Sequence, residues 1–229
     1  MAALQSVGVG DVEGVRAFLA SCPSDDARWA AWCLRRVARE RRAASDRFAQ
    51  SVQLVWSGHR EGSQPLRDTR VVLAEVCARA ERSVTLATYV VYEGRESLAA
   101  LAERMRELPS LRVDLYVHVR AKQGEAAEHA IAAWLARFQI KHWREGVRLP
   151  AIWYDPATID HEGGTSMHAK CVVVDERFAF VTSANFTEAA QERNVEVGVL
   201  LDHPALAQSL CAQFQGLRER GGFRRMPGT

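Results

Sequence analysis

The most informative stretch of this chain runs Met167-His168-Ala169-Lys170-Cys171-Val172-Val173-Val174-Asp175. It joins a His-x-Lys pair to an apolar, β-branched run that ends at an aspartate, and this pattern predicts a strand over 167–174. Alternate residues of a strand project from the same face, so His168 and Lys170 are expected to lie side by side. The stretch therefore predicts an imidazole presented beside an ammonium group.

Two further polar groups follow at short intervals. One is the turn Thr182-Ser183-Ala184-Asn185 after an expected strand over 178–182. The other is Asn194-Val195-Glu196 at the start of an expected strand over 195–201. The turn after the second strand can return its polar side chains to the rim that carries His168. The sequence thus predicts one composite site at neighbouring strand ends.

The residue types of this composite site suit a phosphodiester. The imidazole of His168 can attack phosphorus while the ammonium of Lys170 neutralises a non-bridging oxygen. The Ser183 hydroxyl and the Asn185 amide can donate to the other phosphate oxygens, and a carboxylate at Glu196 can fix the tautomer of His168. A His-x-Lys pair alone is usually an ordinary polar strand face, but the full set at this spacing is hard to obtain by chance.

This spacing resembles the signature of the phospholipase D-like phosphodiesterases. It is similar in particular to the single-motif nucleases of that family, such as small bacterial endonucleases and the mitochondrial cardiolipin-hydrolase-like group. The Asn-Val-Glu-Val at 194–197 is similar to the Asn-x-Glu of those proteins, whereas Thr182 stands where the family often has glycine. The resemblance covers roughly 52–217. It implies an α/β phospholipase D-like domain, a central mixed sheet flanked by helices, and metal-independent nuclease activity through a phosphohistidine intermediate.

The resemblance also implies a role for each motif residue. His168 is the expected nucleophile, and Glu196 is the residue expected to orient it. Asp175 is expected to support the motif structurally rather than to touch substrate. The implied phosphate ligands are Lys170, Ser183 and Asn185. No cofactor is implied, and no His, Cys or Asp cluster has the spacing of a metal site.

The motif occurs once, whereas a closed active site of this family uses it twice. Four further histidines lack a lysine two positions later: His59, His118, His129 and His142. We interpret His118 as a core or edge histidine rather than a ligand, because it lies in an apolar strand pattern. A second His168 is therefore expected from another subunit, which predicts a homodimer with the site at its interface.

The rest of the chain alternates between strand and helix patterns, which predicts an α/β layer fold. Residues 1–50 look like a small helical extension, 51–220 like the catalytic domain and 221–229 like a frayed tail. The remaining strands are expected at 52–56, 83–91, 111–119 and 152–154. Helices are expected at 66–82, 95–108, 123–138 and 205–217.

The composition is that of an ordinary globular protein. The 229 residues are 48% hydrophobic and carry a formal net charge of +2, so the molecule is not a polybasic nucleic-acid binder as a whole. Its five cysteines are scattered, which is typical of reduced cysteines in a cytosolic protein. No signal peptide and no membrane span is visible, so we expect a cytoplasmic protein without stable membrane association.

The substrate stays open at this point. Nucleic acid is the expected partner, and DNA is favoured over RNA. Two alternative functions stay open: a phospholipid-cleaving enzyme, and a non-catalytic nucleic-acid-binding subunit of a defence complex. The length, the helical extension and the single late motif resemble the phospholipase D-like component of bacterial DISARM anti-phage systems, which implies antiviral defence with other defence proteins as partners. An arginine-rich helical stretch fits phosphate contacts or, preferably, a solvated helix face; it contains Arg35, Arg36, Arg39, Arg41, Arg42 and Arg47.

Overall fold

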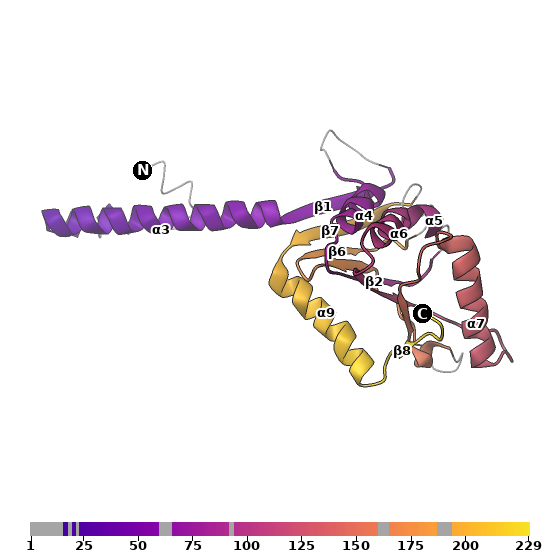
Figure 1. The fold of residues 1–229 in the computed structure, drawn as a ribbon. Coiled ribbons are helices and arrows are strands. Elements are labelled where there is room, and N and C mark those ends of the chain that lie inside the picture. The colour runs from indigo at the N-terminus through magenta and orange to yellow at the C-terminus, as the bar shows by residue number, and fades with distance from the viewer. Residues whose placement is uncertain are drawn as a thin grey trace. The chain divides into compact units, whose positions relative to one another are not determined.

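The computed structural model divides the chain into two compact units, Met1–Ser51 and Val52–Thr229. Each unit is considered by itself. The smaller one contains helix α3 (Ser24–Ser51), and the larger one contains the whole predicted site (Figure 1). The structure describes residues 16–17, 20–21, 23–59, 66–91, 94–159, 165–186 and 194–229.

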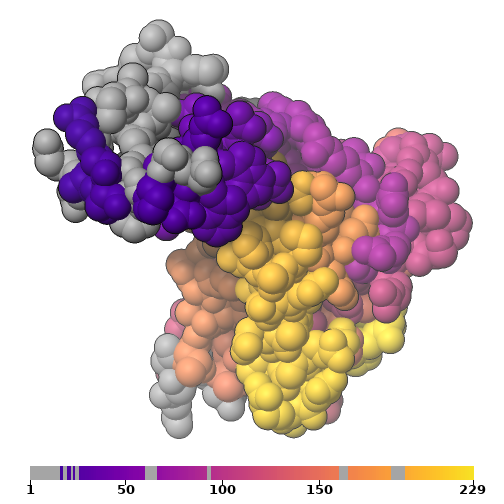
Figure 2. All heavy atoms as spheres, turned by 90° about the vertical axis from the view of Figure 1, so that its left-hand side faces the viewer, coloured from indigo at the N-terminus to yellow at the C-terminus, as the bar shows by residue number. Residues whose placement is uncertain are grey.

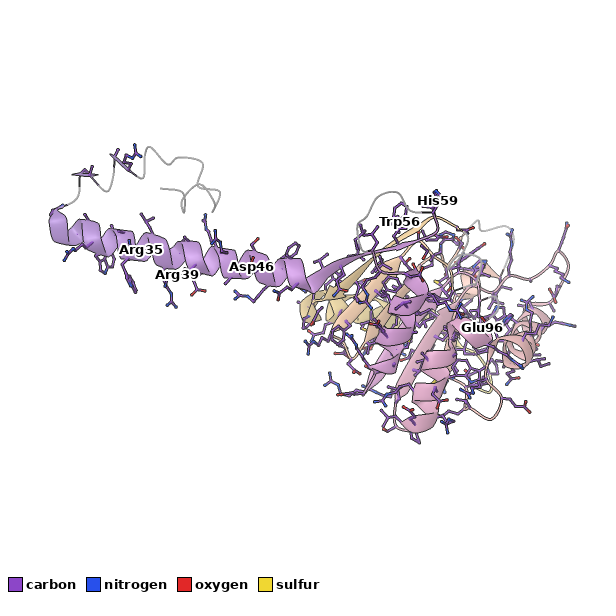
Figure 3. All side chains as sticks on the ribbon, turned by 90° about the horizontal axis from the view of Figure 1, so that it is seen from above. Arg35, Arg39, Asp46, Trp56, His59 and Glu96 are labelled. Atoms are coloured by element: carbon purple, nitrogen blue, oxygen red, sulfur yellow. The ribbon has the colours of Figure 1, made fainter. Side chains whose placement is uncertain are left out.

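Helix α3 exposes a charged surface. Figure 3 shows the side chains of Arg35, Arg39 and Asp46 extending from the helix ribbon. Arg36 forms an ion pair with Glu40 one turn later, at 3.2 Å, and both side chains are exposed. Such a pair adds little to helix stability because water screens it. The arginines therefore lie on a solvated helix face.

The larger unit is built on one mixed sheet of eight strands, in the order β1-β7-β6-β5-β2-β3-β4-β8. Strands β2, β3 and β4 pair in parallel, and the other neighbours pair antiparallel. The strands are β1 (Val52–Ser57), β2 (Ser83–Thr88), β3 (Arg112–Val117), β4 (Ala151–Tyr154), β5 (Cys171–Val174), β6 (Phe178–Thr182), β7 (Glu196–Asp202) and β8 (Arg224–Arg225).

Helices cover both faces of this sheet. On one face, Leu73 of α4 and Leu101 of α6 belong to the same buried cluster as Leu86 of β2. On the other face, Ala207 of α9 packs with Val173 of β5, and α9 forms much of the surface seen in Figure 2, in yellow. The predicted α/β architecture, a central mixed sheet flanked by helices, is confirmed. The α-helices that the structure describes in the sheet unit are α4 (Thr69–Ala78), α5 (Gly94–Ser97), α6 (Ala99–Glu107), α7 (Ala127–Arg137) and α9 (Pro204–Glu219).

Several expected elements have different bounds. The helix expected at 95–108 is two helices, because the chain breaks at Leu98 between α5 and α6. The helix expected at 123–138 begins at Ala127 and continues as a π-helix, Phe138–His142. A π-helix inserts one extra residue per turn and often marks a functional position.

The C-terminal residues are not a frayed tail, so that prediction is wrong. Strand β8 pairs antiparallel with β4, and the Met226 N–H donates to the Ile152 carbonyl oxygen at 2.8 Å. Phe223 and Met226 are buried on either side of this strand, with 7% and 1% of their surface exposed. The short stretch carries no strong strand pattern, but the two apolar anchors hold it against the sheet.

Among the described residues, no helix combines the length and the apolar character that crossing a bilayer requires.

Candidate active site

The candidate site lies at the edge of the sheet where two parallel strands end and β5 begins. Strands β2 and β3 end together, with Thr88 opposite Val117. Strand β5 runs antiparallel to β2, with Cys171 opposite Ala87. Residues that follow β2 and β3 therefore lie beside residues that precede β5. Ligands of open α/β sheets bind outside the carboxyl ends of parallel strands, and the His-x-Lys pair stands at this edge.

The structure brings His168 and Lys170 together. The Lys170 ammonium nitrogen lies 2.8 Å from Nδ1 and 3.1 Å from Nε2 of the His168 ring, and it donates to the His168 carbonyl oxygen at 3.0 Å. Lys170 is buried, whereas His168 is exposed. The pair thus joins a fixed cation to an imidazole that a substrate can reach.

This pair lies just before β5 rather than within it. The strand begins at Cys171, so the predicted strand over 167–174 is wrong in its first four residues. Only the hydrogen bond from the Thr182 N–H to the Lys170 carbonyl oxygen, at 3.1 Å, extends the pairing with β6. Before the strand, Met167 is buried in a second apolar cluster with Cys171 and Phe214.

Burial changes the acidity of Lys170. Removal from water disfavours the charged ammonium and lowers the pKa of Lys170, and the nearby Glu196 carboxylate opposes this change in part. The ammonium is buried without a carboxylate in hydrogen-bond contact within the described part of the chain. A phosphodiester anion at this position would supply the missing negative charge.

Glu196 contacts Ser183 rather than His168. Its carboxylate accepts a hydrogen bond from the Ser183 hydroxyl, and the Asn194 side-chain amide donates to its other oxygen at 3.5 Å. The Ser183 hydroxyl also accepts from the Val197 N–H at 3.1 Å. No hydrogen bond joins Glu196 to His168 among the described residues. In this structure the expected orienting carboxylate positions the serine instead.

The end of β1 passes close to the Asn194 segment and requires glycine there. Gly58 has a φ of +87°, and a Cβ on it would lie 2.4 Å from the Asn194 carbonyl oxygen. The adjoining turn is closed by Trp56, whose indole N–H donates to the His59 carbonyl oxygen at 2.9 Å (Figure 3). Any side chain at Gly58 would both strain the backbone and displace the strand that carries Glu196.

Asn185 presents an unsatisfied amide. Its side-chain oxygen is buried and has no hydrogen-bond partner among the described residues. The following residue, Phe186, is fully buried, and its carbonyl oxygen accepts from the Ser97 hydroxyl at 3.1 Å. The backbone is therefore anchored while the side-chain oxygen lacks a partner. A buried polar atom without a partner is uncommon, and because this oxygen is an acceptor, only a hydrogen-bond donor would complete it.

Asp175 stands at the opposite end of β5 and has a different environment. Its carboxylate accepts from the backbone N–H groups of Glu81, Arg82 and Ser83, at 2.9, 2.7 and 2.9 Å. Asp175 and Glu176 both adopt left-handed backbone conformations, with φ of 53° and 54°, in the tight turn between β5 and β6. Asp175 therefore ties this hairpin to the start of β2 and lies away from the histidine.

Two residues beside His168 were not among the predicted site residues. The Tyr89 ring lies 4.7 Å from the His168 ring and 4.7 Å from the His118 ring, centroid to centroid. The Lys170 ammonium lies 5.7 Å from the centre of the same tyrosine ring. The expectation of a core or edge histidine at His118 did not foresee this contact. Their positions in the sequence could have identified Tyr89 and His118 as site residues, since each follows the end of a parallel strand.

The surroundings of His118 disfavour its protonated form. Burial lowers the pKa of His118 and the positive charge of Arg120 lowers it further, whereas the Asp155 carboxylate opposes this change in part. Its Nδ1 is buried and has no hydrogen-bond partner among the described residues. Within those residues no group of three His, Cys, Asp or Glu side chains has the arrangement of a metal site.

Comparison with known families decides the classification. The family model described as "Cardiolipin synthase, PLD-like domain" matches residues 73–218, which include every residue of the candidate site. The chain belongs to the phospholipase D-like family. The fold agrees, since the Nuc phospholipase D family member from Salmonella typhimurium superposes with a TM-score of 0.50 at 23% identity, over 76% of this chain and 97% of that one.

Two other relatives extend the comparison of this phospholipase D-like chain. The DISARM protein DrmC of Bacillus paralicheniformis is 27% identical over 160 residues, which are 69% of this chain. The match spans 60% of the length of DrmC. Phosphatidylserine synthase of Haemophilus influenzae superposes with a TM-score of 0.50 at 13% identity, over 76% of this chain and 39% of that one. This last likeness concerns the fold alone.

Proposed function

We propose that this phospholipase D-like protein is a metal-independent nuclease that works through a phosphohistidine on His168. The observation that carries the proposal is the buried Lys170 ammonium in contact with the exposed His168 imidazole. An imidazole is a nucleophile for phosphorus, and a fixed cation beside it stabilises the charge that develops on the phosphate oxygens. The N–H groups of the Asn185 side-chain amide donate a further hydrogen bond to the phosphate in this proposal.

The reaction has two displacements at phosphorus. A ring nitrogen of His168 attacks, the bond from phosphorus to the leaving oxygen breaks, and that oxygen takes a proton from a second imidazole. Water then attacks the phosphohistidine after giving its proton to the second imidazole, which releases His168 and the product. Lys170 supplies positive charge in both steps. Because a lysine and an amide provide the electrophilic contacts, no step requires a divalent cation.

The second imidazole is proposed to be His168 of the partner subunit. The chain contains a single His-x-Lys motif, and one histidine cannot attack phosphorus from one side while protonating the leaving oxygen on the other. A twofold axis beside His168 would place two copies on opposite sides of one phosphate. The proposed site is therefore shared by two subunits.

The covalent intermediate provides the direct test. Rapid quench of the protein with a labelled single-stranded oligonucleotide, in excess EDTA, should trap a protein-linked fragment that is stable to base and labile to acid. The His168→Ala variant should form none. Absence of the linked fragment under conditions of full turnover would contradict the proposal, and so would a strict requirement for an added divalent cation.

Subunit mixing tests the shared site. Excess His168→Ala protein, exchanged with wild type, should lower activity by more than dilution alone, because mixed dimers have one histidine. The control is excess Arg112→Ala protein, which alters an exposed residue at the start of β3 and should leave total activity additive. Full activity of a strictly monomeric protein in light scattering would contradict a shared site.

The relation to DrmC supports a place in anti-phage defence, with other defence proteins as partners. A phospholipid-cleaving enzyme is the second candidate. An apolar groove of about 390 Å³ borders His168 and could hold an acyl chain; its apolar lining includes Met167, Leu210, Phe214, Leu217 and Phe223. Hydrolysis of anionic phospholipid vesicles, measured beside hydrolysis of DNA, distinguishes the two candidates.

A further inference from the structure

A second cavity, of about 550 Å³, adjoins the His168 site and takes no part in the chemistry described above. Its size is that of cavities that enclose small ligands, which range over about 300–1,000 Å³. Tyr89 forms the common wall, because its ring contacts His168 and also lines the cavity. The opposite wall is formed by α7 and the π-helix that follows it.

The charge of the cavity is positive. Arg120, Arg137 and Lys141 line it, and the described lining residues include no aspartate or glutamate. Arg137 and Lys141 form no ion pair within the described part of the chain. Burial lowers the pKa of the lining histidine His118, which disfavours a positive charge on that residue. The cavity therefore offers Arg137 and Lys141 to an anion, and no carboxylate lines it among the described residues.

The walls of the cavity also carry aromatic rings. Trp134 of α7 lines it opposite Tyr89, and the Trp134 indole stacks on the buried Phe138 ring at 5.3 Å with an interplanar angle of 10°. Phe138 in turn stacks on Trp143 at 5.6 Å. The stack of Trp134, Phe138 and Trp143 fixes the orientation of the half-buried Trp134 indole. Rigid aromatic faces beside cations are the combination that binds the bases and phosphates of an unpaired strand.

We propose that this cavity binds the nucleotide next to the scissile phosphate, so that the substrate is a single-stranded nucleic acid. The base would stack on Trp134 or Tyr89, and Arg137 and Lys141 would hold the neighbouring phosphate. A paired base already stacks on its neighbours within the duplex, so only an unpaired base can enter. This inference rests on the proposed nuclease function and specifies its substrate class.

The cation count favours nucleic acid over phospholipid. A diacyl phospholipid carries one phosphodiester, and the proposed chemistry places that group at His168 and Lys170. Arg137 and Lys141 would then have no phosphate to bind. A nucleic-acid strand repeats its phosphates, so a strand cleaved at His168 presents a second phosphate one nucleotide away. Tyr89 borders both cationic positions, so one strand that passes Tyr89 could present a phosphate to each of them.

The first experiment removes the two cations. Arg137→Ala/Lys141→Ala should lower kcat/KM on a single-stranded DNA oligonucleotide at least roughly tenfold while hydrolysis of bis(p-nitrophenyl) phosphate stays unchanged, because that small substrate reaches only His168. The slope of log affinity against log salt should fall by about 0.7, since the two side chains hold one phosphate and each phosphate contact on a single strand contributes about 0.7. The control Arg112→Ala/Arg225→Ala removes the same charge at exposed positions away from the cavity.

The second experiment removes the stacking face. Trp134→Leu should weaken binding of a single-stranded oligonucleotide roughly tenfold and leave binding of an abasic oligonucleotide of equal length unchanged. Trp134→Phe keeps an aromatic ring on Phe138 and should retain most of the affinity. The thermal unfolding midpoints of both variants show whether each protein still folds. If the Leu variant does not fold, the Phe variant decides the outcome.

Binding to catalytically inactive His168→Ala protein separates this inference from the proposed function. If wild type cleaves nothing but His168→Ala protein binds single-stranded DNA through Arg137 and Lys141, the nuclease proposal fails and the cavity assignment stands. Equal binding by the cavity variant and its control, in fluorescence anisotropy, overturns the assignment even if DNA is cleaved. A third outcome also overturns the assignment. In it, the protein hydrolyses phosphatidylglycerol vesicles and binds no DNA, and the cavity variants hydrolyse the vesicles as fast as wild type does.

Discussion

The two ends of strand β5 differ in how well their polar groups are satisfied. At one end, the Asp175 carboxylate accepts three backbone N–H groups at the start of β2. At the other end, His168 is exposed and Lys170 is buried. Within the described ranges, Lys170 has no carboxylate in hydrogen-bond contact and the Asn185 amide oxygen has no partner. One sequence motif thus combines an anchor for the fold with groups that await a ligand, and mutations at its two ends should have separable effects.

The largest effect is expected at the histidine end. His168→Ala should lower kcat on bis(p-nitrophenyl) phosphate at least about 1,000-fold, because the nucleophile is lost. The thermal unfolding midpoint should stay near that of wild type, since the ring is exposed and Lys170 keeps its bond to the backbone carbonyl of residue 168. Undiminished turnover by this variant would falsify the assignment of the nucleophile.

Asp175→Ala should have the opposite profile. Three backbone N–H groups lose their acceptor, and alanine tolerates the left-handed conformation poorly, so the free energy of unfolding should fall by about 2–4 kcal/mol. The folded fraction should keep the kcat of wild type. Urea unfolding and activity below the transition measure both quantities.

Two matched variants control the Asp175 experiment. Asp175→Asn retains an acceptor and a residue that tolerates positive φ, and should lie between alanine and wild type. Asp202→Ala removes an exposed ion pair with Arg177 and should change stability much less. If Asp175→Ala had normal stability but lost turnover, Asp175 would act in the chemistry rather than as an anchor of the fold, which would contradict this assignment.

Lys170→Ala should lower kcat about 100-fold, because one charge contact to the phosphate oxygens is lost. The pH profile gives a finer test. Burial lowers the pKa of Lys170, so activity that needs the ammonium should fall at a lower pH than the ordinary lysine pKa would predict. Lys170→Arg keeps its charge and should move that alkaline limb upward. An identical alkaline limb in wild type and Lys170→Arg would exclude Lys170 as its cause.

The same lowered pKa predicts how stability changes with pH. The native state releases the Lys170 proton at a lower pH than the unfolded chain does, so the unfolded state binds more protons between the two pKa values. The free energy of unfolding should therefore rise with pH across that window in wild type, relative to Lys170→Met. Parallel urea midpoints for the two proteins across the window would contradict this.

The smallest effect is expected at Glu196, which acts on the site through Ser183. Glu196→Gln keeps the hydrogen bond and should lower kcat about tenfold or less, within the range of a general positioning effect. If Glu196 instead orients His168 across the subunit interface, the acid limb of the pH profile should shift and kcat should fall by more than that. The comparison of Glu196→Gln with Ser183→Ala distinguishes these roles.

Local patterns in the sequence were enough to predict much of the molecule. The β-branched run 171–174 indicates a buried strand, and the alternation of strand and helix patterns indicates the layered fold. The His-x-Lys spacing places two side chains on one side of the chain, and the structure puts them in contact. These features depend on residues a few positions apart, so a pattern along the chain contains the physical information that determines them.

Tertiary structure decided what depends on register between distant segments. Tyr89 reaches His168 only because β2 pairs with β5, and His118 joins them only because β3 ends level with β2. The contact of Glu196 with Ser183 and the pairing of β8 with β4 also join segments that no local pattern relates. The sequence by itself determined which chemical groups this protein has, whereas strand pairing and packing decided which of them meet, because contacts between distant segments depend on the free energy of the whole sheet.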